Sequence, residues 1–106
     1  MADMATPESK IQSAVLKRLK KQGIFCWRQN NLAIFDPKMN GYRSFNGLKG
    51  VPDILAVING KFTGFEIKTP KGRQSADQKL FQQRLERNGG DYYLIRDVSD
   101  LDEIGL

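Results

Sequence analysis

The chain has 106 residues, a formal net charge of +5, one cysteine and no histidine, which is enough for one domain over residues 1–106 with a modest core. The lone cysteine excludes an intrachain disulfide, and the absence of histidine excludes zinc sites of the usual composition and every mechanism that needs an imidazole. Any bound metal must therefore be held by oxygen ligands, which favours magnesium or manganese.

The charge is unevenly distributed along the chain. Residues 1–90 carry 16 Lys and Arg against 7 Asp and Glu, whereas residues 91–106 carry one arginine against five acidic residues. A basic body with an acidic tail is typical of proteins that bind a polyanion, although a generic solvated basic surface gives the same balance. The longest apolar stretch, 54–58, is too short to cross a bilayer, and no signal peptide is recognisable. We therefore expect a soluble, intracellular protein.

Residues 1–5 are expected to be disordered, and a first helix is predicted to begin directly after them. Thr6 is a preferred N-cap residue, and Pro7 suits the first helical position. Gly23 ends this helix, and a strand over 24–29 follows. The helix has apolar residues at helical spacing, which predict its buried face: Ile11, Ala14, Val15 and Leu19.

The segment 30–50 is the least regular part of the sequence, with turn signals and one short edge strand predicted over 42–45. Beyond the central hairpin, the pattern predicts a helix over 75–88, a strand over 91–96 and a short acidic helix over 99–104. The residues expected to face inward from the second helix are Ala76, Leu80, Phe81 and Leu85. The resulting order, α-β-(β)-β-β-α-β-α, indicates an α/β fold.

The central hairpin carries the chemistry. Asn59-Gly60 between two runs of strand-forming residues indicates a two-residue turn, so the numbers of facing residues sum to 119 and Asp53 faces Glu66. Their Cβ atoms would lie about 4.5–5.5 Å apart. Two like charges at this distance are destabilising unless a cation lies between them. Lys68 points to the same face. This arrangement predicts a divalent-metal site suited to phosphodiester hydrolysis.

These three side chains also have plain structural interpretations. Asp53 and Glu66 would be a surface carboxylate pair, which the apolar neighbouring strands disfavour. Lys68 would form an ion pair with one of them, and such a pair is compatible with a role in catalysis.

Together with flanking residues, the hairpin resembles the signature of the PD-(D/E)XK nuclease superfamily, and specifically the VRR-NUC (virus-type replication-repair nuclease) family in its small stand-alone phage or bacterial type. The matching residues are Glu8, Pro52, Asp53, Glu66, Ile67, Lys68 and Gln78, and the likeness spans about residues 8–97. It implies a restriction-endonuclease-like core, in which helices flank a mixed β-sheet in the order α-β-β-β-α-β. The small size and the lack of targeting signals fit the cytoplasm of a bacterium or of a phage-infected host cell.

The resemblance implies a role for each matching residue. The expected metal ligands are Glu8, Asp53, Glu66 and the backbone carbonyl of Ile67, and the expected catalytic residues are Glu8, Asp53, Glu66, Lys68 and Gln78. Lys68 would contact the attacking water or stabilise transition-state charge, and Gln78 would brace the site or contact the phosphate. Glu8 could instead complement the dipole of the first helix, and Gln78 could be one of several exposed glutamines.

Lys71, Arg73 and Lys79 border the same end of the hairpin and are expected to bind DNA phosphates. The favoured function is a Mg²⁺- or Mn²⁺-dependent, structure-specific DNA endonuclease. By resemblance it would work as a homodimer on branched DNA such as Holliday junctions, where two-fold symmetry lets two sites cut opposing strands. The alternatives are a non-catalytic nucleic-acid-binding module on a nuclease scaffold, and a nuclease that acts on flapped or plain duplex DNA.

Overall fold

The computed structural model describes residues 6–29, 34–43 and 48–106. The expected disorder of residues 1–5 and the end of the predicted strand 42–45 fall outside these ranges. The elements in chain order are α1 (Pro7–Lys21), β1 (Phe25–Arg28), β2 (Ile34–Asp36), β3 (Gly41–Arg43), β4 (Ile54–Ile58), β5 (Lys61–Ile67), α2 (Ala76–Arg87), β6 (Asp91–Ile95) and α3 (Asp100–Glu103).

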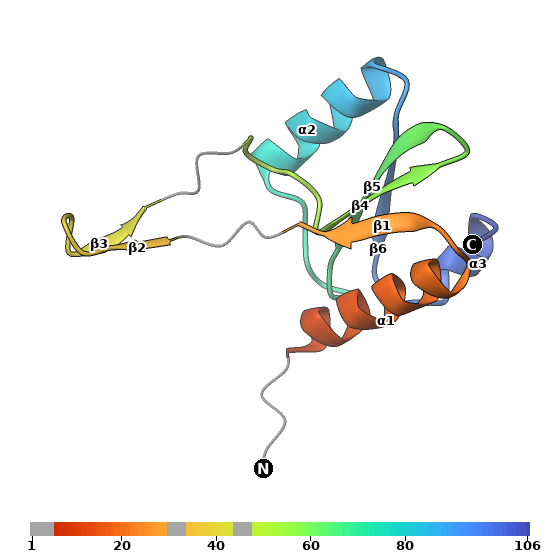
Figure 1. Cartoon of the computed structure of the whole chain (residues 1–106), viewed down its shortest axis with the longest axis horizontal. Helices are drawn as coiled ribbons and strands as arrows, with labels where there is room; N and C mark the ends of the chain where they lie inside the picture. Colours follow the sequence, from red (N-terminus) through yellow and green to blue (C-terminus); the bar gives the residue numbers. More distant parts are fainter. Residues whose placement is uncertain (1–5, 30–33, 44–47) are drawn as a thin grey trace, which may run out of the picture.

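Four of the strands form one mixed sheet in the order β1-β4-β5-β6, in which only the β5–β6 pair is parallel. α1 lies against one face of this sheet and α2 against the other (Figure 1). The predicted α/β class, with a mixed sheet flanked by helices, is therefore confirmed. The parallel pair is possible because α2 supplies the long crossover that such a pair requires.

β2 and β3 form a separate two-stranded antiparallel sheet that stands away from the main sheet (Figure 1). The sequence predicts one short strand in this region, and the described residues form two. β2 is only three residues long and has no clear alternation of apolar and polar residues, so its pairing with β3 across the turn at 37–40 gives it its identity as a strand.

α1 follows the sequence prediction at both ends. The Thr6 hydroxyl accepts a hydrogen bond from the Ser9 amide at 3.1 Å, and Gly23 takes a left-handed conformation with φ +77° just after the helix. Val15 and Leu19 are fully buried against the sheet. They belong to the main core, which lies between α1 and the sheet and contains Cys26, Ile54, Ala56, Phe65, Ile67, Ile95 and Leu101.

α2 differs from the prediction on its buried face. Its capping box at Ser75 is present, but none of its residues is fully buried: Ala76 is exposed, Leu80 is 53% exposed, and Phe81 and Leu85 are half-buried. The inward placement of Ala76 and Leu80 is therefore wrong. The helix approaches the sheet where β5 and the start of β6 offer glycines, so that only a narrow stripe around Leu85 makes close contact.

The β4–β5 hairpin has the predicted register. Asn59 and Gly60 both have positive φ, 53° and 78°, as a two-residue hairpin turn requires. Facing pairs run from Ile58 and Lys61 to Ile54 and Phe65. The ladder ends at that last pair, so Asp53 and Glu66, which the sequence predicts to face each other, lie just beyond the regular ladder.

The C-terminal end of the chain packs beside the end of α1 (Figure 1). The Arg18 guanidinium forms an ion pair with Asp102 and donates a hydrogen bond to the Leu106 carbonyl. In the described ranges, none of the helices has the length and apolar character needed to cross a lipid bilayer.

Gly50, which precedes the β4–β5 hairpin, packs closely against the backbone of the first turn of α2. Its φ is +75°, and a Cβ there would lie 2.2 Å from the Asp77 carbonyl oxygen. We expect Gly50→Ala to lower the free energy of unfolding by at least about 2 kcal/mol, because backbone strain and steric overlap both oppose it. Urea denaturation followed by circular dichroism measures the loss.

Gly89→Ala is the matched control for this prediction. Gly89 also has a positive φ, +89°, but a Cβ there would meet nothing within 4 Å. Its substitution should cost only the backbone strain, about 1 kcal/mol. Equal losses in the two variants would contradict the close packing at Gly50.

Candidate active site

Asp53 is positioned by the hairpin but lies one residue before β4. The buried Pro52 precedes it, and its side-chain Oδ2 accepts a hydrogen bond from the Ile67 amide of β5 at 2.8 Å. Its backbone carbonyl accepts from the Gln29 amide at 2.8 Å. These bonds hold Asp53 at the end of β5 although the regular ladder has stopped.

Glu66 is the most deeply buried ionisable side chain at this end of the sheet, with 2% of its surface exposed. Its Oε1 accepts a hydrogen bond from Gln78 Nε2 at 3.0 Å and lies 3.9 Å from the Lys68 ammonium. Its Oε2 is buried and, among the described residues, has no hydrogen-bond partner. A buried carboxylate oxygen without a partner is costly, so this position favours a proton or a cation.

The electrostatics of Glu66 follow from this environment. Burial is the largest cause that raises the pKa of Glu66 to about 9, and the charge of Asp53 raises it as well, while Lys68 acts in the opposite direction. The charge of Glu8 raises the Glu66 pKa further. Without a metal, Glu66 therefore carries a proton at neutral pH.

The donor set fits a hard divalent cation. Two carboxylates converge, one of their oxygens is buried without a partner, and Mg²⁺ and Mn²⁺ prefer such oxygen ligands. Within residues 6–29, 34–43 and 48–106, no group of three or more acidic or cysteine side chains forms a metal-binding cluster. Carboxylate ligation of a metal would therefore rest on Asp53 and Glu66.

Glu8 and Ile67 flank this pair. Glu8 is half-buried in the first turn of α1 and acts on Glu66 through its charge. Ile67 is fully buried, and its amide already holds Asp53. Both residues lie near the pair, and their roles as metal ligands stay predictions.

Gln78 has a defined orientation. Its Oε1 accepts a hydrogen bond from the Ser75 amide at 2.8 Å as part of the capping box of α2. Because the oxygen is committed to the cap, the side-chain nitrogen is the end that reaches Glu66. The structure thus places Gln78 as a brace for the carboxylate.

The three expected DNA-binding cations, Lys71, Arg73 and Lys79, are all exposed. Lys71 and Arg73 lie in the loop between β5 and α2, and Lys79 lies in the first half of α2. They share the end of the sheet that carries Lys68.

Arg96 is a residue of this site that the sequence analysis counted only as a charge of the C-terminal tail. Its Nη1 donates hydrogen bonds to three carbonyls of the loop after Lys68, those of Thr69 (2.6 Å), Pro70 (3.2 Å) and Gly72 (2.7 Å). β6 is parallel to β5, so residues that follow the two strands meet at one edge of the sheet. That rule is the signal that could have identified Arg96.

Tyr92 is a second such residue. It is 7% exposed, and its hydroxyl accepts a hydrogen bond from Gln74 Nε2 at 3.0 Å. Burial raises the pKa of Tyr92 to about 12, with smaller contributions from the charges of Glu66 and Asp53. The phenol therefore stays neutral beside the carboxylates, and no sequence pattern pointed to it.

The raised pKa of Glu66 predicts the pH dependence of stability in the metal-free protein. The folded state holds the Glu66 proton up to about pH 9, whereas the unfolded chain releases it near 4.5. Stability should therefore fall as the pH rises from about 5 to about 9, by at most about 1.4 kcal/mol per pH unit. Thermal unfolding in chelator across this range measures the slope, and no histidine contributes to it.

Glu66→Gln imitates the protonated side chain and should flatten this slope. Glu103→Gln removes an exposed carboxylate of α3 and should leave it unchanged. A slope of the same size in Glu66→Gln and in the wild type would contradict the assignment.

Comparisons with known proteins agree with the architecture. No family model matches the sequence, and no curated protein matches it significantly. A solved structure described as a VRR_NUC domain aligns with a TM-score of 0.69 at 19% identity, over 94% of this chain and 95% of that chain. At this level of identity the likeness concerns the fold, and the chain has the fold of a VRR_NUC domain.

Proposed function

We propose that this chain is a DNA endonuclease that depends on Mg²⁺ or Mn²⁺ and hydrolyses phosphodiester bonds at the site around Glu66. The observation that carries the proposal is the buried Glu66 Oε2, which has no partner among the described residues although it lies beside Asp53. A structural carboxylate would be paired on both oxygens, whereas a metal ligand needs a lone pair in reserve. The VRR_NUC fold adds support.

In this proposal each side chain has one task. Asp53 and Glu66 would hold the metal, with the Ile67 carbonyl and Glu8 as further candidates, and Gln78 keeps Glu66 in place. The metal, when bound, would polarise the scissile phosphate and lower the pKa of a water. Lys68 is 16% exposed and lies just beyond hydrogen-bond distance of Glu66, so it is available to orient the water or to stabilise phosphate charge.

The substrate proposed is branched DNA such as a Holliday junction, bound through phosphate contacts from Lys71, Arg73 and Lys79. Exposed cations beside the carboxylate pair support a polyanionic substrate. Arg96 would maintain the shape of the loop that carries two of them.

A homodimer is proposed because the sheet face on the α2 side exposes an apolar row. Phe25, Val57 and Phe62 are facing neighbours on three adjacent strands, and they are 70%, 40% and 40% exposed. A contiguous apolar row of this kind favours a protein–protein interface. A second copy that covers it would bring two sites to one junction.

Substitutions at the carboxylate site test the enzymatic proposal. We expect Asp53→Asn, Glu66→Gln and Lys68→Ala each to lower the rate of DNA cutting with Mg²⁺ or Mn²⁺ by about 100-fold or more, because each removes charge from the reacting centre. The rate is measured by gel electrophoresis of labelled DNA.

Lys61→Ala is the matched control, since Lys61 lies on the same strand but at the distant turn, where it pairs with Asp91. It should cut at the wild-type rate. Calorimetric titration of Mn²⁺ should show binding to the wild type and not to Asp53→Asn. Variants that cut as fast as the wild type would refute this site, and a lack of metal binding would favour the non-catalytic binding module.

Cleavage of a panel of four-way junctions, flaps and plain duplexes tests the substrate. We expect the junction to be cut fastest, with paired cuts in opposing strands, because a two-fold assembly presents two sites. Phe25→Glu should separate the protomers, so that the two opposing strands of the junction are no longer cut as a pair. Sedimentation measures the assembly.

Met39→Glu places the same charge on another exposed apolar residue, 63% exposed and outside the main sheet, and should leave assembly and cutting unchanged. Equal rates on junction and plain duplex would remove the preference for branched DNA while leaving the nuclease proposal intact.

A further inference from the structure

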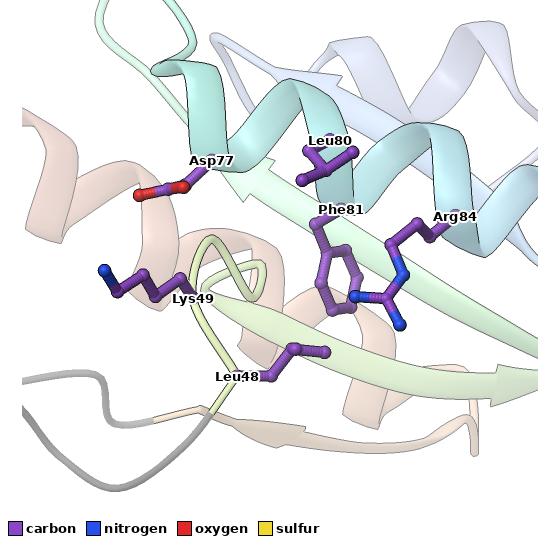
Figure 2. Close-up of a pocket in the computed structure, with 6 residues that line it drawn as sticks. All are labelled: Leu48, Lys49, Asp77, Leu80, Phe81 and Arg84. Atoms are coloured by element: carbon purple, nitrogen blue, oxygen red, sulfur yellow. The ribbon is translucent and has the colours of Figure 1, made fainter.

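A pocket of about 310 Å³ opens beside the first half of α2, on the side that faces the 48–49 segment (Figure 2). Its lining residues are Leu48, Lys49, Asp77, Leu80, Phe81 and Arg84. None of them belongs to the carboxylate site. The volume lies at the lower end of the range of small-ligand pockets, about 300–1,000 Å³.

The pocket combines an apolar surface with charged ends, which carry Arg84 on one side and Lys49 with Asp77 on the other. Phe81 and Leu48 point toward one another, Arg84 lies at one end beside the Phe81 ring, and Lys49 and Asp77 lie at the other end (Figure 2). The apolar part is accessible, because Leu48 is 57% exposed and Leu80 is 53% exposed. An apolar and aromatic surface between two cations complements a flat ring that carries phosphates on both sides.

We infer that this pocket takes one unpaired nucleobase of a DNA substrate, with its flanking phosphates on Lys49 and Arg84. The inference rests on the proposed nuclease function and specifies its substrate as DNA with an unpaired nucleotide close to the cutting site. The Phe81 ring offers a stacking surface, which every base can use. A base inside a regular duplex cannot reach such a pocket, whereas an unpaired base can be extruded at low cost.

Direct contacts connect the pocket with the carboxylate site through the first turn of α2. Gly50, next to Lys49, packs so closely on the Asp77–Gln78 peptide that a Cβ would lie 2.2 Å from the Asp77 carbonyl oxygen and 2.8 Å from the Gln78 amide nitrogen. The Gln78 side chain in turn donates to Glu66. The first turn of α2 therefore carries both Asp77 of the pocket and Gln78, which binds Glu66, so a base held here would lie near the reacting phosphate.

Asp77 adds a preference among bases. A carboxylate accepts hydrogen bonds and offers none, so it favours bases with an exocyclic amino group, such as cytosine, over thymine. The cationic ends cannot discriminate in this way because phosphates are common to all nucleotides. The pocket should therefore favour an unpaired cytosine over an unpaired thymine.

The test compares the affinity of the wild type for two labelled duplexes, one fully paired and one with a single bulged cytosine, by fluorescence anisotropy in chelator so that nothing is cut. We expect the bulged duplex to bind about tenfold more tightly, as base–aromatic stacking predicts. Phe81→Leu, which keeps an apolar side chain but removes the ring, should bring the ratio close to one, and Phe81→Tyr should preserve it.

Arg84→Gln and Arg87→Gln form a matched pair on the same helix, and only Arg84 lines the pocket. Arg84→Gln should reduce the ratio of the affinity for the bulged duplex to the affinity for the paired duplex, and Arg87→Gln should leave this ratio unchanged. Equal affinity for the two duplexes in the wild type, or a ratio that survives Phe81→Leu, overturns the pocket while leaving the nuclease proposal intact. Absence of binding to any DNA overturns the proposed function itself, and the pocket with it.

Discussion

Two carboxylates that share one buried position impose the main constraint on this molecule. Glu66 is almost fully inaccessible, lies beside Asp53 and has one oxygen without a partner among the described residues. Either a proton or a cation must compensate Glu66, because a desolvated carboxylate beside a second carboxylate is costly when it stays charged. In the metal-free protein a proton compensates this charge, and in the proposed nuclease a divalent cation would take its place.

The surrounding structure keeps this unfavourable pair together. The Asn59-Gly60 turn sets the register of the hairpin, and the Ile67 amide binds Asp53 just where the ladder stops. On the opposite side, the capping box of α2 orients Gln78 toward Glu66. The turn and the capping box are common stabilising devices, while the Ile67 amide binds Asp53 and the Gln78 side chain binds Glu66. Stability and site geometry consequently depend on the same few hydrogen bonds.

α2 contributes little to the core, and it contacts the carboxylate pair and lines the pocket beside Phe81. None of its residues is fully buried, and the fully buried core lies on the α1 side of the sheet. Its first turn is instead pinned by Gly50 and connects the carboxylate pair with the pocket beside Phe81. The first turn of α2 therefore joins the residue that orients Glu66 to a residue of the pocket.

The sequence alone determined the local features of this protein: the cap at Thr6, the hairpin turn, the register of the hairpin, and the order of the main-sheet elements. These depend on neighbours a few residues apart, where residue type limits backbone conformation directly. Only the tertiary structure decided which face of α2 is buried, that β2 pairs with β3, and that Arg96 binds the loop after Lys68. Those outcomes depend on contacts between segments that are distant in the sequence. The packing of the whole chain sets these contacts, and the residue pattern of a single segment does not reveal them.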